Sequence, residues 1–179
     1  MAKPIYFCNG RYLTADRTAI PVCDLGLIRG FGLFESLRTY GRKPFLLEAH
    51  LKRLFSAAKK VGLKPPLNRN AMGRVIGNLL RKNDFDELLI RIILTGGPSH
   101  GLLPQNHPTL IIMADPFHPF PKRQYEKGVK LMSTRFFRIH PELKSTVYFS
   151  AVVETMRAAR RGFDEVVYAD DHGAILEGT

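Results

Sequence analysis

Residues 33–62 read LFESLRTYGRKPFLLEAHLKRLFSAAKKVG and contain two hydrophobic periods in succession. Apolar and polar residues alternate from Leu33 to Tyr40, as they do in a strand with one buried face. Gly41 to Lys43 turns the chain back into Pro44 to Leu46. From Leu47 onward apolar residues recur every three or four positions, which predicts an amphipathic helix that ends at Gly62. A strand hairpin followed directly by a helix favours an α+β fold for this part of the chain.

Similar elements lie on both sides of this stretch. Upstream, Asn9-Gly10 suits the positive φ angles of a type I′ turn and joins predicted strands at 5–8 and 11–13. Downstream, the pattern predicts a helix with one apolar stripe, formed by Met72, Val75, Ile76, Leu79 and Leu80. Further strands are predicted at 88–95, 109–114, 129–134, 165–169 and 174–176, with a helix at 148–161.

The segment from Asp115 to Lys122 contains three prolines and is the best candidate for a linker. We therefore predict an N-terminal α+β domain at 1–115, a linker at 116–122, and the first part of a mixed α/β C-terminal domain at 123–179. The sequence stops directly after a predicted strand. We expect a chain truncated at its C-terminal end, with the rest of that domain missing.

Composition excludes several classes of function. The chain has 179 residues and a formal charge of +11, but the basic residues form no block or tail, which favours a solvated basic face over a nucleic-acid site. Cys8 and Cys23 have neither metal-ligand spacing nor a disulfide pattern, so no metal site is expected. No signal peptide and no membrane-spanning run is visible, which makes the cytoplasm the expected location and a membrane partner unexpected.

The segment Lys144-Ser-Thr-Val-Tyr148-Phe lies between a predicted strand and a predicted helix. It is followed by Glu-Val-Val-Tyr at 165–168 and Ile-Leu-Glu-Gly-Thr at 175–179. Together with Gly32-Leu-Phe-Glu35 and His50-Leu-Lys-Arg53-Leu, in collinear order over almost the whole chain, these segments resemble the class-IV aminotransferases. These are the fold-type-IV pyridoxal-phosphate enzymes: branched-chain aminotransferases, D-amino-acid aminotransferases and aminodeoxychorismate lyases.

The resemblance implies a role for each of several residues. Lys144 would be the Schiff-base lysine and the base that moves the substrate proton. Glu177 would pair with the pyridine nitrogen of pyridoxal 5'-phosphate and keep it protonated. Arg53 would bind the cofactor phosphate, because its planar fork is always charged. Tyr148 would donate a hydrogen bond to the phenolic oxygen of the cofactor. A substrate pocket would include Phe31, Glu35 and His100.

Three departures from the family pattern bear on these roles. Val147 stands where many members have Asn, which affects hydrogen bonding around Lys144, and Leu25 stands where many have Arg. The loop Thr95-Gly-Gly-Pro-Ser-His100-Gly lacks the arginine that D-amino-acid enzymes use to hold the substrate carboxylate. The remainder of the phosphate site is expected beyond Thr179, so the truncated chain alone should bind the cofactor weakly and be inactive.

The resemblance implies an aminotransferase that uses a branched-chain L-amino acid and 2-oxoglutarate, and that forms a homodimer. An aminodeoxychorismate lyase on the same scaffold is the first alternative, because both reactions begin with loss of the Cα proton. A D-amino-acid aminotransferase is the second alternative. A non-catalytic basic binding module is a distant third, supported by the net charge alone.

Overall fold

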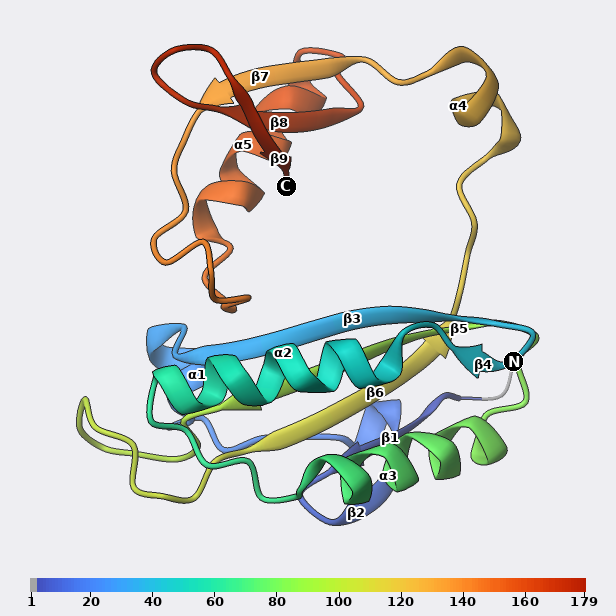
Figure 1. Cartoon of the computed structure of the whole chain (residues 1–179), viewed down its shortest axis with the longest axis vertical. Helices are drawn as coiled ribbons and strands as arrows, with labels where there is room; N and C mark the ends of the chain where they lie inside the picture. Colours follow the sequence, from blue (N-terminus) through green and yellow to red (C-terminus); the bar gives the residue numbers. More distant parts are fainter. Residues whose placement is uncertain (1–2) are drawn as a thin grey trace. The chain divides into compact units, whose positions relative to one another are not determined.

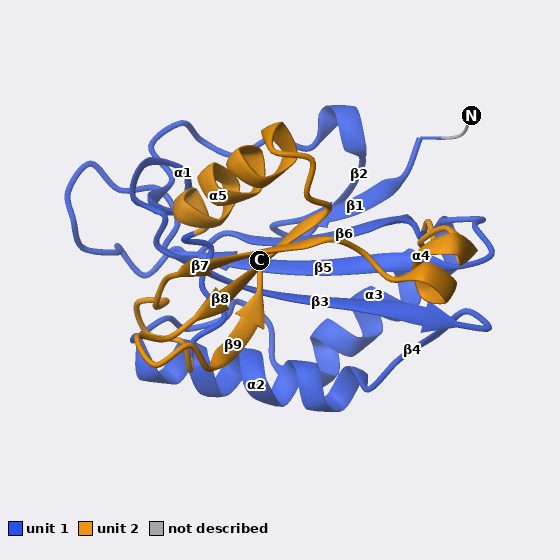
Figure 2. Ribbon diagram, turned by 90° about the horizontal axis from the view of Figure 1, so that it is seen from above, with its two compact units in different colours: residues 1–117, 143–147 blue, residues 118–142, 148–179 orange. Residues whose placement is uncertain are grey.

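The structure is a computed structural model that describes residues 3–179 (Figure 1). The chain forms two compact units (Figure 2). Unit 1 comprises the residues up to Phe117 together with Leu143–Val147, and unit 2 comprises His118–Glu142 and Tyr148–Thr179. The short segment Leu143–Val147 is thus grouped with the residues before the predicted linker, although it lies after the linker in sequence. The domain limits 1–115 and 123–179 stay predictions.

Unit 1 is built on a six-stranded antiparallel sheet with strand order β2-β1-β6-β5-β3-β4. Its strands are β1 (Ile5–Cys8), β2 (Arg11–Thr14), β3 (Gly32–Tyr40), β4 (Lys43–Pro44), β5 (Leu88–Thr95) and β6 (Leu110–Pro116). Its helices are a 3₁₀ turn at Ala15–Arg17, α1 (Leu25–Arg29), α2 (Leu47–Lys60) and α3 (Arg69–Lys82).

Turn residues place the strand and helix ends where the sequence predicts them. Asn9 and Gly10 have φ angles of 44° and 90°, as the tight hairpin between β1 and β2 requires. Gly62 has φ 74° and follows the end of α2, a conformation that glycine adopts without steric cost. The predicted hairpin and the predicted end of this helix are confirmed.

The core of unit 1 lies between one face of the sheet and the two long helices (Figure 1). Leu37, Ile90 and Ala114 are neighbours across β3, β5 and β6, and all three are buried. Helix α2 covers this face with Leu51 and Leu54, and α3 covers it with Met72, Ile76 and Leu79. The alternation along each strand therefore sends one set of side chains into an apolar core and the other set to the opposite face.

The segment Leu143–Val147 lies along the start of β3 like an additional strand. The N–H of Phe34 donates to the carbonyl of Lys144 at 2.8 Å, and the N–H of Thr146 donates to the carbonyl of Gly32 at 2.9 Å. The hydroxyl of Thr146 also donates to the carbonyl of Gly30 at 3.0 Å. These bonds fix the main chain from Lys144 to Thr146 to the edge of the sheet.

Unit 2 is smaller and contains a three-stranded mixed sheet with strand order β7-β8-β9. Its elements are α4 (Lys122–Lys127), β7 (Leu131–Arg135), α5 (Phe149–Arg160), β8 (Glu165–Ala169) and β9 (Ile175–Gly178). β7 and β8 are parallel and are separated in sequence by α5, whereas β8 and β9 form an antiparallel pair. An α+β part followed by a mixed α/β part is the fold class predicted from the sequence, and it is confirmed. None of the helices in residues 3–179 has the length and apolar character needed to cross a membrane.

Candidate active site

Lys144 lies in the connection between β7 and α5 and is half-buried. Its Nζ is 4.3 Å from the centroid of the Phe34 ring, a distance at which an ammonium group is attracted to the face of an aromatic ring. Phe34 is on β3, and its side chain points away from the face that α2 covers, because its neighbours Leu33 and Glu35 are the buried residues. The sheet edge thus positions both the main chain and the amine of Lys144.

Arg53 extends from α2 and forms a two-bond ion pair with Glu35 on β3. Its Nε and Nη2 donate to the two carboxylate oxygens of Glu35, each at 2.6 Å. The Glu35 side chain is 0% exposed, whereas the Arg53 side chain is 53% exposed. The hydrogen bonds to Glu35 raise the pKa of Arg53 above its ordinary value, against partial burial, which lowers it. Arg53 is therefore a permanent cation, and the edge of its guanidinium that carries Nε and Nη2 is fixed by Glu35.

His50 completes this cluster one helical turn before Arg53. Its Nδ1 is 2.7 Å from Oε2 of Glu35, and the His50 side chain is 19% exposed. Because an ionised carboxylate only accepts hydrogen bonds, this nitrogen must donate the proton of the bond. Glu35 thus accepts three short hydrogen bonds from two residues of α2.

Unit 2 contains a second arginine–carboxylate pair, between Arg138 and Glu177. Nε of Arg138 donates to Oε1 of Glu177 at 2.6 Å. The Arg138 side chain is 17% exposed and the Glu177 side chain is 48% exposed. Burial, the largest single influence, lowers the pKa of Arg138, but the attraction of Tyr148 and Glu177 raises it above its ordinary value overall. The carboxylate of Glu177 therefore lies beside a charged guanidinium.

Tyr148 and Tyr168 lie on the other sides of Arg138. The guanidinium carbon is 4.6 Å from the Tyr148 ring centroid and 5.5 Å from that of Tyr168. Tyr148 precedes the first residue of α5, and Tyr168 is paired with Glu177 across β8 and β9. Unit 2 thus brings together two residues that the sequence predicts for the site, Tyr148 and Glu177, around an arginine that it does not predict.

The remaining predicted residues are placed less distinctively. Phe31 is half-buried, packs against the core of unit 1 and donates its N–H to the carbonyl of Leu25 at 3.1 Å. His100 is exposed in the loop between β5 and β6. Leu25 is 0% exposed and Val147 is 57% exposed. Substrate contacts of Phe31, Glu35 and His100 stay predictions, and Glu35 is already engaged by Arg53 and His50.

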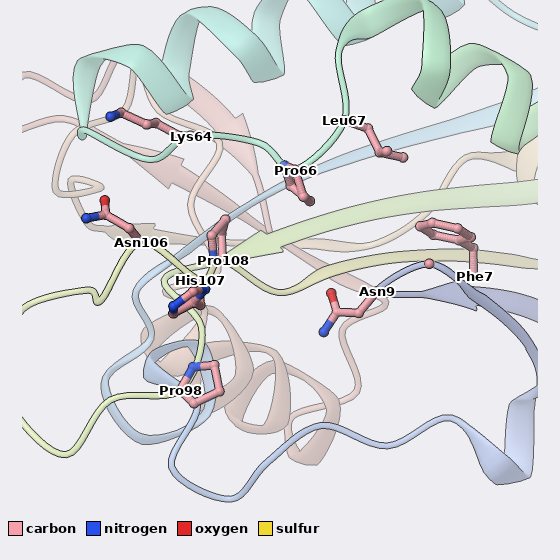
Figure 3. A pocket seen from close by; sticks show the side chains of 10 residues that line it. Phe7, Asn9, Lys64, Pro66, Leu67, Pro98, Asn106, His107 and Pro108 are labelled. Carbon is pink, nitrogen blue, oxygen red and sulfur yellow. The ribbon is translucent and has the colours of Figure 1, made fainter.

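A surface cavity of about 570 Å³ lies elsewhere in unit 1 (Figure 3). None of the predicted site residues lines it. Its lining comes from β1 and the β1–β2 turn, the α2–α3 connection and both ends of the β5–β6 loop: Phe7, Asn9, Gly10, Lys64, Pro66, Leu67, Pro98, Asn106, His107 and Pro108. Within residues 3–179, no three or more His, Cys, Asp or Glu side chains are grouped so that they could hold a metal ion.

Comparison with known proteins identifies the family to which this chain belongs. Residues 32–179 match the family described as amino-transferase class IV, and the chain belongs to this family. A Methanocaldococcus jannaschii protein whose name assigns it to the branched-chain-amino-acid aminotransferases is 31% identical over 97% of this chain. The aminodeoxychorismate lyase of Bacillus subtilis is 27% identical over 96% of this chain.

A solved structure shows the same fold. The branched-chain aminotransferase of Thermoproteus uzoniensis, determined with norvaline, is 26% identical and superposes with a TM-score of 0.86 over 99% of this chain. That match covers 63% of the Thermoproteus chain. The present chain likewise spans 62% of the Methanocaldococcus protein and 61% of the Bacillus protein.

Proposed function

We propose that the protein containing this chain is a pyridoxal-phosphate-dependent aminotransferase. Its substrates in this proposal are branched-chain L-amino acids as amino donors and 2-oxoglutarate as acceptor. The observation that carries the proposal is the arrangement around Glu177, a carboxylate beside the Arg138 guanidinium and close to Tyr148. The family membership of the chain and the Methanocaldococcus and Thermoproteus relatives support the same activity.

Each residue proposed for the site, taken within its own unit, has chemistry suited to one group of pyridoxal 5'-phosphate. Arg53 offers a half-exposed, permanently charged guanidinium for the phosphate. Glu177 offers a half-exposed carboxylate for the pyridine nitrogen, and Tyr148 offers a phenol for the phenolic oxygen. Lys144 offers the primary amine that holds the aldehyde carbon. When bound, the cofactor supplies a sink for the electrons released at the substrate Cα.

The residues of this chain would then divide the work as follows. Lys144 would hold the cofactor and move the proton released at the substrate Cα. Two main-chain bonds would keep its nitrogen in range, one from the N–H of Phe34 to the carbonyl of Lys144 and one from the N–H of Thr146 to the carbonyl of Gly32. Nε of Arg138 fixes the carboxylate of Glu177 in place, and this carboxylate would hold the ring nitrogen of the cofactor through a charge-assisted hydrogen bond.

Specificity follows from the substrate pocket, for which Phe31, Glu35 and His100 are the candidates from the sequence. The β5–β6 loop lacks an arginine, which favours L-amino acids over the D-amino-acid alternative.

The Bacillus relative favours aminodeoxychorismate lyase as the second candidate function. Incubation of the full-length protein with leucine and 2-oxoglutarate, and separately with aminodeoxychorismate, distinguishes the two. Glutamate formation without pyruvate release supports the aminotransferase, and the reverse supports the lyase.

A homodimer is also part of the proposal. Val22, Leu27, Leu102 and Leu103 are 82%, 62%, 77% and 79% exposed in neighbouring segments of unit 1. These segments are joined by a bond of 3.0 Å from the N–H of Ser99 to the carbonyl of Cys23. Exposed apolar residues grouped in this way are typical of protein interfaces.

We propose a cytoplasmic location and neither a nucleic-acid nor a membrane partner. A salt-dependent affinity for DNA or RNA would instead favour the basic binding module.

The decisive test of the proposed function is substitution of Lys144. The full-length protein should show the visible absorption of bound pyridoxal phosphate, and borohydride should remove it. Lys144→Ala should abolish that absorption and lower kcat by about 1000-fold or more, because the residue that accepts the proton is lost. A Lys144→Ala protein that keeps the borohydride-sensitive absorption would contradict the assignment.

A further inference from the structure

Glu35 occupies a position in β3 where the alternation of the strand calls for an apolar residue. Leu33 and Leu37, its neighbours on the same face, are 3% and 4% exposed and belong to the core. Across the sheet Glu35 is paired with Ile92, which is 0% exposed. A carboxylate buried in such surroundings is costly unless it is paired and hydrogen-bonded, and an apolar residue of similar size would usually be as stabilising. Stability alone therefore does not account for Glu35.

The geometry of the pair indicates what Glu35 does. Its two oxygens take one N–H from Nε and one from Nη2 of Arg53, each at 2.6 Å. A guanidinium has five N–H donors in one plane, so three of them are not used by these two bonds. Two bonds to one carboxylate fix both the position and the plane of the group, which a single bond cannot do.

His50 fixes the carboxylate in turn. Its Nδ1 bond of 2.7 Å to Oε2 holds the oxygen that also accepts from Nη2 of Arg53. Because His50 and Arg53 both belong to α2, the carboxylate is held against one face of this helix. Glu35 is thus a buried acceptor that His50 orients. Arg53 binds this acceptor with one edge of its guanidinium and directs the opposite edge away from the core.

We propose that Glu35 is a positioning residue: it orients Arg53 so that the outer edge of the guanidinium binds the phosphate group of the cofactor. This inference rests on the proposed function and deepens it. It assigns to Glu35 an action through Arg53, in place of the direct substrate contact expected from the sequence.

The test compares two forms of the cofactor that differ in the phosphate alone. Full-length protein freed of cofactor is titrated with pyridoxal phosphate and with pyridoxal, and binding is followed by visible absorption. Glu35→Gln should weaken pyridoxal phosphate binding by about 10-fold, as loss of a charge-assisted bond implies, and change pyridoxal binding less than about 2-fold. Equal losses for both ligands, or no loss, would overturn the proposal.

Three further variants separate positioning from a general structural effect. Arg53→Lys keeps the charge but loses the fork, and the double variant Glu35→Gln/Arg53→Lys should bind pyridoxal phosphate no more weakly than the weaker of the two single variants, since both changes remove one effect. Additive losses would contradict this. Glu87→Gln is the matched control, because Glu87 binds Thr39 and the N–H of Gly41 in the same unit, and it should not alter the ratio between the two ligands.

The result also distinguishes this inference from the proposed function. Wild-type protein that binds no pyridoxal phosphate overturns both. Wild-type protein that binds it normally, with Glu35→Gln unchanged, overturns the positioning role alone. If Glu35→Gln does not fold, Glu35→Asp replaces it, because the shorter side chain keeps the charge but cannot bridge both nitrogens at the observed distances. It should then show the same phosphate-specific loss, and equal losses for pyridoxal would overturn the proposal.

Discussion

The two arginine–carboxylate pairs, Arg53–Glu35 and Arg138–Glu177, differ in which partner is buried. In unit 1 the carboxylate of Glu35 is 0% exposed and the side chain of Arg53 is 53% exposed. In unit 2 the arginine is the more buried partner: Arg138 is 17% exposed and Glu177 is 48% exposed. Each pair is joined to a ring, His50 in unit 1 and Tyr148 in unit 2.

The difference shows how one kind of ion pair can prepare two kinds of binding group. In each pair the more buried partner is fixed by its surroundings and in turn fixes the position of the more exposed partner. The charge of the more exposed partner stays accessible to solvent or to a ligand. Unit 1 therefore presents a cation, suited to a phosphate, and unit 2 presents an anion, suited to a protonated ring nitrogen.

The largest expected effect comes from removing Arg53, the exposed partner of the unit 1 pair, and Arg138 in unit 2 is the comparison. Arg53→Met should lower the free energy of unfolding by about 3 kcal/mol, because it leaves the buried carboxylate of Glu35 with His50 as its remaining described partner. Arg138→Met should cost about 1 kcal/mol or less, because water can solvate the half-exposed Glu177. Urea denaturation of the full-length protein without cofactor measures both values. Equal losses of unfolding free energy would mean that the burial of the remaining carboxylate does not set the cost of removing its arginine.

A smaller effect is expected when the outer anion loses its charge. Glu177→Gln should lower kcat by about 30-fold, equivalent to about 2 kcal/mol, because an amide no longer favours the protonated ring nitrogen. The affinity for pyridoxal phosphate should change less than it does in Glu35→Gln, since the phosphate contact is intact. Steady-state kinetics with leucine and 2-oxoglutarate checks this, and an unchanged kcat would remove Glu177 from the proposed site.

The smallest expected effect comes from removing the hydroxyl of Tyr168, whose ring lies beside Arg138. Tyr168 is 1% exposed, and its hydroxyl has no hydrogen-bond partner among the described residues. Tyr168→Phe should therefore change stability near neutral pH by less than about 0.5 kcal/mol, or raise it slightly. By contrast, Tyr6→Phe in unit 1 removes a hydroxyl that binds Asp115 and should be destabilising.

The same substitution has a pH signature. Burial raises the pKa of Tyr168 above its ordinary value of 10.0. The folded state then retains the phenolic proton better than the unfolded state does, so this contribution to stability is present below about pH 10 and is lost as the pH rises through the folded pKa. Denaturation curves above pH 9 should show a weaker alkaline decline for Tyr168→Phe. An identical decline would indicate that another group is responsible.

The sequence predicts the local structure well, because turn residues and periodicity are local signals. The strand at 88–95 coincides with β5, and the helix expected from Leu47 coincides with the start of α2. The proline-rich segment is followed by the short helix α4 at Lys122–Lys127, which has no long apolar period and was not predicted. The strand order depends on pairing between distant segments, which periodicity does not encode.

The candidate site is predictable in part. Motifs make Lys144, Arg53, Glu177 and Tyr148 candidates for the site, but their partners depend on three-dimensional contacts. Arg138 carries no motif of its own, and nothing local marks it as the partner of Glu177. Glu35 did carry a signal, since it interrupts the alternation of Leu33 and Leu37 with a charge on the core-facing side. Read physically, that interruption points to a buried partner and not to an exposed pocket residue.

The attachment of Leu143–Val147 to β3 has a consequence for biosynthesis. The bond from Thr146 to Gly30 joins residues 116 positions apart in sequence. During vectorial synthesis the edge of β3 at Gly32–Phe34 emerges from the ribosome long before the segment that pairs with it, and an unpaired strand edge is prone to pair with other chains. The lysine of the proposed site is thus anchored by a contact that forms only after all six described strands of this sheet have been synthesised. We expect this edge to be open to wrong pairing until residues 144–146 have been synthesised.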